Sequence, residues 1–176
     1  MRKPALRNHF PRHSDPPHGG NTGFVDQHKA LAAMPEGLRS RLEGKNANQS
    51  ARRAYAPTGA YGDAYQTRGK KRGFKIKASE SANDTQTHPI IRKHPETGEE
   101  SLFSCIGYII GIEGMAEDEA NLLLKDLYDW QTRPEFQYSH EWKPGMVVMW
   151  DNRSVLHKAN GGFEGCERLL HHTVIA

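Results

Sequence analysis

The spacing of apolar residues predicts different structures in successive parts of the chain. Residues 1–21 combine several Pro and His with almost no aliphatic side chains, which predicts an irregular segment. Apolar residues recur at helical spacing between Leu31 and Leu42, so this part predicts a helix that is interrupted or restarted near Pro35. Residues 44–87 are polar and glycine-rich, with almost no apolar period. They predict a long loop or a lid-like insert.

From residue 88 onward, the apolar positions form short runs that are typical of strands. Residues 102–112 are one strand-like stretch, and residues 146–150 are a second, fully apolar one. Apolar and polar residues alternate over 136–142, and the residues on one side of this strand are Phe136, Tyr138, His140 and Trp142. Residues 169–175 predict a closing strand.

Among these strands the pattern predicts one helix. The acidic residues 117–119 place negative charge where the first turn of a helix favours it. Apolar residues between Ala120 and Trp130 then follow the three- and four-residue spacing of a buried helical face, and Pro134 ends the pattern. Short strands joined by turns predict a mainly β fold with flanking helices, a sandwich or barrel with the helix packed outside.

Composition limits the classes of protein. The chain has 176 residues, the size of one domain. No apolar run reaches the roughly 18–20 residues of a membrane span, and the basic N-terminus leads into no apolar segment of a secretory signal. Cys105 and Cys166 indicate no disulfide framework, so we expect reduced thiols in the cytoplasm. A net charge of +3, from 24 basic and 21 acidic groups, does not argue for a nucleic-acid partner.

Candidate chemistry concentrates near the C-terminus. His157 follows the end of the strand-like run, and imidazole is a common ligand of iron, zinc or copper. Arg168 comes eleven residues later, across a turn at 160–162, so both side chains can face one cavity. A planar guanidinium matches a carboxylate in bidentate geometry. One metal ligand beside one carboxylate clamp is what a metal-bound keto acid requires, although each residue alone is also typical of an ordinary surface.

Five motifs stand in order over residues 19–176. They are Gly19-Gly-Asn-Thr22, His88-Pro-Ile-Ile-Arg-Lys-His-Pro-Glu-Thr-Gly98, Trp150-Asp-Asn-Arg153, His157-Lys-Ala-Asn160 and Arg168-Leu-Leu-His171. This order resembles the TauD/TfdA family of Fe(II)- and 2-oxoglutarate-dependent dioxygenases, such as taurine dioxygenase. The resemblance implies a double-stranded β-helix, or jelly roll, over residues 19–176, with residues 1–18 as an irregular leader.

The resemblance also implies roles for the residues at matching positions. His157 corresponds to the distal histidine of the family's two-histidine, one-carboxylate iron site. Arg168 corresponds to the arginine that holds the distal carboxylate of 2-oxoglutarate, and Thr22 to the threonine that supports it. Residues 150–153 then frame the site by packing and strand-end hydrogen bonds, and the motif at 88–98 marks a hairpin and a turn. The implied reaction hydroxylates a small organic substrate with molecular oxygen and converts 2-oxoglutarate to succinate.

Two positions depart from the family pattern. The family's other two iron ligands come as His-x-Asp or His-x-Glu well before Gly-Gly-x-Thr, whereas here His13-Ser-Asp15 stands four residues before Gly19. We therefore expect a jelly roll that is incomplete at its N-terminus, with weak iron binding and with self-association into homo-oligomers. His172 stands where many members have an arginine, which weakens the inference of an anionic substrate and would make anion binding depend on pH.

Three other interpretations stay open. A partial domain that keeps only His157 and Arg168 would be a catalytically inactive member of the family. A nucleic-acid binder would use Arg52, Arg53, Tyr55 and the basic run at 68–77. A zinc site would use the N-terminal side chains His9, His13, Asp15 and His18.

Overall fold

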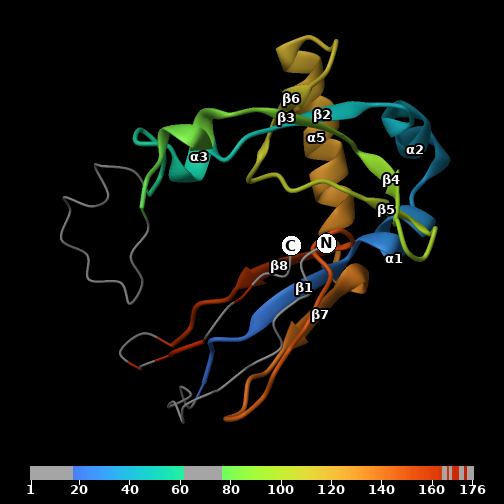
Figure 1. Ribbon diagram of the computed structural model, residues 1–176. Coiled ribbons are helices and arrows are strands. Elements are labelled where there is room, and N and C mark those ends of the chain that lie inside the picture. Colours follow the sequence, from blue (N-terminus) through green and yellow to red (C-terminus); the bar gives the residue numbers. More distant parts are fainter. Residues whose placement is uncertain (1–17, 62–76, 164–165, 167, 171–172, 174–176) are drawn as a thin grey trace. The chain divides into compact units, whose positions relative to one another are not determined.

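The computed structural model describes residues 18–61, 77–163, 166, 168–170 and 173 (Figure 1). The chain divides into two compact units. The central unit consists of Val25–Gln137 and Asp151–Leu156, and the terminal unit of Met1–Phe24, Tyr138–Trp150 and His157–Ala176. Residues 1–17 lie outside the described part, so the irregular leader and the domain boundary after it stay predictions. No helix in the described ranges is long and apolar enough to cross a bilayer.

The central unit holds most of the helices and strands. In chain order they are α1 (Gln27–Ala32), α2 (Glu36–Leu42), β2 (Asn46–Gln49), α3 (Arg52–Tyr55), the 3₁₀ turn η1 (Glu80–Asn83), β3 (Gln86–Pro89), β4 (Ile91–Lys93), β5 (Glu100–Leu102), β6 (Ile109–Ile112), α5 (Glu117–Gln131) and η2 (Pro134–Phe136). β2 pairs antiparallel with β3 and β6, with Ala47 opposite His88 on one side and Ile112 on the other. β4 and β5 form a separate antiparallel pair.

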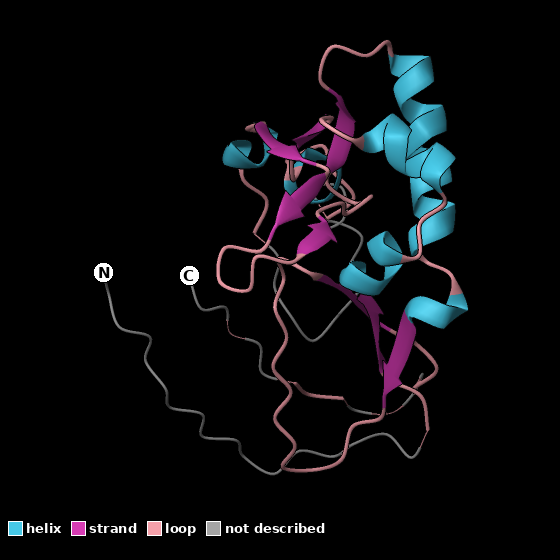
Figure 2. Cartoon of the chain, turned by 90° about the vertical axis from the view of Figure 1, so that its right-hand side faces the viewer, coloured by secondary structure: helices cyan, strands magenta, loops and turns pink. Residues whose placement is uncertain are grey.

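α5 covers the core of the central unit, and Figure 2 shows this long helix beside the strands. Its buried side chains are those expected from the helical spacing: Ala120, Leu123, Leu124 and Leu127, together with Gln131. They pack in one cluster with Leu42, Ile90, Leu102 and Ile109. The helix ends at Gln131, before Pro134, because the residue that precedes a proline is driven out of the helical region.

The interrupted helix predicted around Pro35 is confirmed. α1 begins after Asp26, whose Oδ1 accepts a hydrogen bond from the Lys29 amide at 3.0 Å, a usual N-terminal cap. α1 ends at Ala32, and α2 begins directly after Pro35. The proline lacks an amide hydrogen and has its φ fixed at −57°, so it opens a new helix and cannot continue the old one.

The second three-stranded sheet has the order β7-β1-β8, from β1 (Thr22–Asp26), β7 (Gln137–His140) and β8 (Val155–Ala159) (Figure 1). The central strand β1 carries the threonine of the Gly-Gly-x-Thr motif, and β8 carries His157. This sheet therefore positions the residues that the sequence marks as functional.

Several strand predictions need correction. The stretch 102–112 is two strands separated by a turn, in which the amides of Tyr108 and Ile109 both donate to the Cys105 carbonyl. Residues 146–150 form no regular strand, because no strand of the described chain pairs with them, and Met149 is 86% exposed. Phe136 lies in η2, so the predicted strand 136–142 is β7 alone.

The segment 44–87 is also more ordered than a long loop. Its described parts supply β2, α3, η1 and the start of β3. β2 is polar in sequence and becomes a central strand because Asn46–Gln49 pairs on both edges. Residues 62–76, with most of the basic run, lie outside the described part, and the lid-like role stays a prediction. Leu169 and Leu170 have no regular structure, and most of the closing strand predicted at 169–175 is outside the described residues.

Candidate functional site

Two glycine turns hold the start of β1 in place within the terminal unit. Gly19 and Gly20 both have positive φ, at 71° and 72°. A Cβ on Gly19 would lie 2.1 Å from the carbonyl oxygen of Gly162, so only glycine fits there. The Gly20 amide donates to the Gly161 carbonyl at 3.1 Å, and the Asn160 amide donates to the Asn21 carbonyl at 2.8 Å. These contacts place Thr22 directly beside the turn that follows β8.

The structure brings Thr22 and Arg168 together from opposite ends of the chain. Thr22 is 6% exposed, and its Oγ1 accepts a long hydrogen bond of 3.5 Å from Nη2 of Arg168. The Arg168 guanidinium also lies over the ring of Phe163, with Cζ 5.5 Å from the ring centroid. A hydroxyl and a guanidinium side by side form a donor-rich site that suits a carboxylate.

A third residue of this cluster, Trp142, was not assigned to the site from the sequence. Its indole Nε1 donates to Thr22 Oγ1 at 2.9 Å. The signal was the alternation along 136–142, because Tyr138, His140 and Trp142 do share a side. Their rings follow one another, with centroids 6.2 Å apart for Tyr138 and His140 and 4.8 Å apart for His140 and Trp142.

His157 lies on β8 in an aromatic setting. Its ring centroid is 4.8 Å from that of Trp150 and 6.4 Å from that of Phe24, while the Phe24 and Trp150 rings are 5.3 Å apart. The imidazole itself is exposed. No group of three His, Cys, Asp or Glu side chains that could hold a metal occurs in the described ranges. His13, Asp15 and His172 lie outside them, so their predicted roles are not tested.

Strand β1 links the two halves of this site. Thr22 and Phe24 are two residues apart on the strand, so their side chains lie on the same face of the sheet. Both are buried. Thr22 contacts Arg168, and Phe24 contacts the ring of His157. His157 and Arg168 therefore both adjoin side chains on this face of β1.

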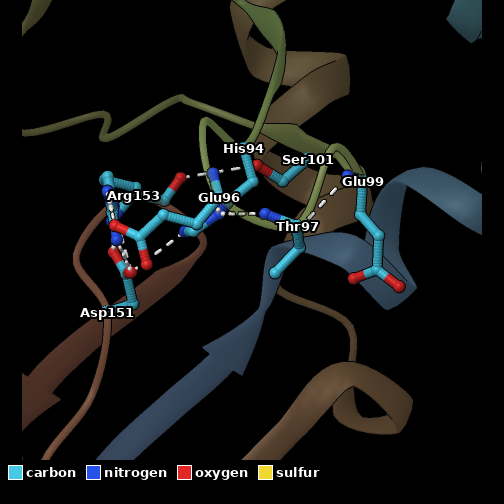
Figure 3. Close-up of polar contacts among 7 residues, drawn as sticks. All are labelled: His94, Glu96, Thr97, Glu99, Ser101, Asp151 and Arg153. Carbon is cyan, nitrogen blue, oxygen red and sulfur yellow. Dashed lines mark hydrogen bonds and ion pairs between the residues drawn. The ribbon is translucent and has the colours of Figure 1, made fainter.

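A separate polar network occupies the central unit (Figure 3). Arg153 donates to the Asp151 carboxylate from Nε, at 2.9 Å and 3.0 Å, and from Nη2 at 2.5 Å. Its Nη1 reaches Glu96 Oε1 at 3.1 Å. His94 Nε2 is 3.0 Å from Asp151 Oδ2. The hydrogen bonds from Arg153, with a smaller contribution from His94, hold the pKa of Asp151 well below its usual range, although burial opposes the shift.

The neighbours of His94 assign its tautomer. The amides of Glu96 and Thr97 both donate to Nδ1, each at 3.3 Å, so Nδ1 is an acceptor and Nε2 carries the hydrogen that Asp151 receives. The His94 to Gly98 segment is the turn between β4 and β5 that the sequence predicts, and Gly98 adopts a φ of 74° within it. His94 in this motif makes hydrogen bonds that hold the turn and join it to Asp151.

Residues 3–174 match the family model described as taurine catabolism dioxygenase TauD, TfdA family. This chain belongs to the TauD/TfdA family. It is similar to (S)-phenoxypropionate/alpha-ketoglutarate-dioxygenase of Sphingobium herbicidovorans, at 33% identity over 90% of this chain and 53% of the relative. It is also similar to alpha-ketoglutarate-dependent 2,4-dichlorophenoxyacetate dioxygenase of Cupriavidus pinatubonensis, at 36% identity over 81% of this chain and 45% of that relative.

Solved structures of TauD/TfdA proteins share the fold. A taurine dioxygenase from Burkholderia xenovorans superimposes with a TM-score of 0.64, at 27% identity over 85% of this chain and 44% of that one. The structure of AAD-2 in complex with Mn(II) and N-oxalylglycine superimposes with a TM-score of 0.65. Its sequence is 27% identical, over 84% of this chain and 54% of that one. The predicted class, mainly β with flanking helices on the jelly-roll plan, is thereby confirmed. Fe(II) and 2-oxoglutarate are the cofactor and cosubstrate of the family. The chain spans about half the length of the curated relatives it matches.

Proposed function

We propose that this TauD/TfdA protein hydroxylates a small organic substrate with molecular oxygen and Fe(II), and couples the reaction to oxidative decarboxylation of 2-oxoglutarate to succinate. In this proposal Arg168 and Thr22 hold the distal carboxylate of 2-oxoglutarate, and His157 is one of the iron ligands. The observation that carries it is the shared face of β1, on which Thr22 meets Arg168 and Phe24 meets His157.

The chemistry of Arg168 and Thr22 supports a carboxylate ligand. A guanidinium keeps its charge at any physiological pH and offers N–H donors in a planar fork, which matches the two oxygens of a carboxylate. Thr22 is buried at the same place and adds a hydroxyl. Arg168 and Thr22 would hold the distal carboxylate of a keto acid on the face of β1 where the ring of Phe24 adjoins that of His157.

Among the residues that the structure describes, His157 is the one that we propose as an iron ligand of the family type. His13-Ser-Asp15, outside the described residues, spells the family's His-x-Asp motif but stands only four residues before Gly19, so we propose that this chain binds iron weakly. Two histidines and one carboxylate leave open coordination positions for the cosubstrate and for oxygen. When bound, Fe(II) supplies the activation of oxygen, and the protein orients the keto acid and the substrate around it.

A small organic anion is the substrate class that we propose. The relatives of this chain include dioxygenases named for phenoxypropionate and 2,4-dichlorophenoxyacetate, and one alpha-ketoglutarate-dependent sulfonate dioxygenase from Schizosaccharomyces pombe. Both cysteines are unpaired, which agrees with the reducing cytoplasm that we propose as the location. The nucleic-acid and zinc interpretations rest mainly on residues outside the described part and receive no support from these relatives.

The test is succinate release from 2-oxoglutarate with Fe(II), over a panel of phenoxy acids, sulfonates and alkyl sulfates. Arg168→Ala should raise the KM for 2-oxoglutarate steeply, because losing a charge-assisted pair costs ~2–5 kcal/mol. Arg168→Lys should recover part of the loss, since an ammonium lacks the fork. Arg41→Ala is the matched control, because Arg41 makes an exposed ion pair with Asp126 in the central unit.

Two results would contradict the proposal in different ways. An unchanged KM in Arg168→Ala would show that the cosubstrate is anchored elsewhere. Succinate release that no member of the panel stimulates, in a folded protein saturated with Fe(II), would favour the catalytically inactive alternative.

A further inference from the structure

The buried hydroxyl of Thr22 faces two groups that can only donate. The indole Nε1 of Trp142 lies 2.9 Å from Oγ1, and Nη2 of Arg168 lies 3.5 Å from it. Indole and guanidinium nitrogens carry hydrogens and accept none. The Thr22 oxygen therefore accepts on both sides, and its own hydrogen must point in a third direction.

That third direction lacks an acceptor within the described part of the chain, although Thr22 is 6% exposed. A buried donor without an acceptor is unfavourable, so the site is complete only when an acceptor enters it. Because the Arg168 guanidinium adjoins the same hydroxyl, an anionic oxygen is the acceptor that fits best. A carboxylate oxygen accepts hydrogen bonds and donates none.

Trp142 stands two residues after the end of β7, and its ring contacts that of His140, the last residue of that strand. The His140 ring meets the Trp142 ring edge to face, at 4.8 Å and an interplanar angle of 88°. Nδ1 of His140 is in turn 3.5 Å from the Tyr138 hydroxyl. This row of rings fixes the direction of the indole N–H. We propose that Trp142 is a positioning residue, which orients the Thr22 hydroxyl so that it donates to the distal carboxylate of 2-oxoglutarate; this inference rests on the proposed function.

The orientation has a consequence for selectivity. While Trp142 donates to Thr22, the Thr22 hydroxyl and the Arg168 guanidinium offer only donors to a ligand. A ligand that ends in a carboxylate therefore binds well. A ligand that ends in an amide binds less well, because it brings N–H donors of its own. Without the indole N–H, the hydroxyl can rotate and accept a hydrogen bond from an amide. Loss of Trp142 should therefore weaken carboxylate binding and reduce the preference for carboxylate over amide.

The experiment uses the full chain labelled with ¹⁵N, titrated with N-oxalylglycine, a 2-oxoglutarate analogue, and with the terminal amide of that compound. Trp142→Phe should raise the Kd for N-oxalylglycine roughly 3- to 10-fold, the range for one neutral hydrogen bond, and reduce the preference over the amide. In a Thr22→Val background the same change should have no further effect, because the two residues act through one hydroxyl. The indole N–H signal of Trp142 should shift on binding.

Trp130 provides the matched control. Its Nε1 also donates to a protein oxygen, the Ala30 carbonyl at 2.8 Å, but within the central unit. Trp130→Phe should leave both Kd values unchanged, and its indole signal should not move. If Trp142→Phe fails to fold, a benzothienyl analogue of tryptophan at position 142 replaces the N–H by sulfur and preserves the ring.

The outcomes separate this inference from the proposed function. Binding that depends on Arg168 and Thr22, but is unchanged in Trp142→Phe or in the benzothienyl variant, would overturn the role of Trp142 alone. Failure to bind N-oxalylglycine, or binding that is indifferent to Arg168→Ala, would overturn both.

Discussion

The imidazole of His94 donates a hydrogen bond to the carboxylate of Asp151, 3.0 Å away and 57 residues further along the chain. This bond ties the turn between β4 and β5 to the segment that leads into β8. His94 is 7% exposed, whereas the Asp151 side chain is 36% exposed and also binds Arg153. The hydrogen bond joins two of the family motifs, because the motif at 88–98 supplies the donor and the motif at 150–153 supplies the acceptor.

The first prediction concerns how the contribution of Asp151 to stability depends on pH. A carboxyl whose pKa is lowered by folding stabilises the protein above its ordinary pKa, and this contribution is lost as the pH falls toward the lowered value. Asp151→Asn should therefore cost about 1–2 kcal/mol at pH 7, a figure kept modest by the partial exposure, and progressively less below about pH 4. Urea unfolding between pH 3 and 7 measures this difference.

Asp129→Asn is the control for this series. Asp129 pairs with Lys125 on the exposed face of α5, where solvent screening leaves an ion pair with little effect on stability. If Asp151→Asn loses no more unfolding free energy than the control, or loses more of it in acid than at pH 7, the prediction for the Asp151 network is wrong.

A second prediction tests the contact between two glycine turns. Gly19→Ala combines a left-handed φ with a direct clash against the Gly162 carbonyl. Gly44→Ala has a similar φ of 68° but no neighbouring atom within 4 Å. Gly44→Ala should cost about 1–2 kcal/mol from backbone strain, and Gly19→Ala distinctly more. Thermal melts of both variants measure the difference, and equal losses would show that the turns do not touch.

A third prediction concerns two buried glutamines, Gln27 and Gln131, which are each 1% exposed. Neither amide atom of Gln27 has a hydrogen-bond partner in the described part of the chain, whereas the Gln131 amide and Ser104 bond to each other. Gln27→Met should stabilise the protein by about 1–3 kcal/mol, because it removes an unpaired polar group. Gln131→Met should destabilise it, because it leaves Ser104 without its partner. The free energy of unfolding of each variant measures these changes. A loss of stability in Gln27→Met, or a gain in Gln131→Met, would contradict the prediction.

A fourth prediction concerns self-association, which the sequence already suggested. Val147 and Met149 lie in a segment without regular structure and are 59% and 86% exposed. Neighbouring apolar side chains at a surface favour contact with another molecule. The double change Val147→Lys and Met149→Lys should reduce concentration-dependent association in sedimentation velocity. Leu122→Lys, on an equally exposed single leucine of α5, should not. A monomeric native chain at all concentrations would refute this expectation.

Helix positions were predictable because their signals are local. The spacing from Ala120 to Leu127 reports which side of α5 is buried, and Pro35 separates α1 from α2 because a proline inside a helix removes a backbone hydrogen bond. The sequence motifs likewise identified Thr22, His157 and Arg168 through resemblance. Strands were less predictable: the polar residues of β2 carry no β pattern, and the apolar run at 146–150 looks like a strand but pairs with nothing in the described chain.

The sequence by itself determined the family, the helices α1, α2 and α5 and the types of side chain available for chemistry, since these depend on residue identity and short-range spacing. Only the tertiary structure decided which side chains meet. The bond from Trp142 to Thr22 spans 120 residues, and that from Arg168 to Thr22 spans 146. Such pairs arise because β1 lies between β7 and β8, so the central strand collects side chains that are distant in sequence onto one face. Local patterns carry no information about pairing of this kind, because it depends on how distant strands align.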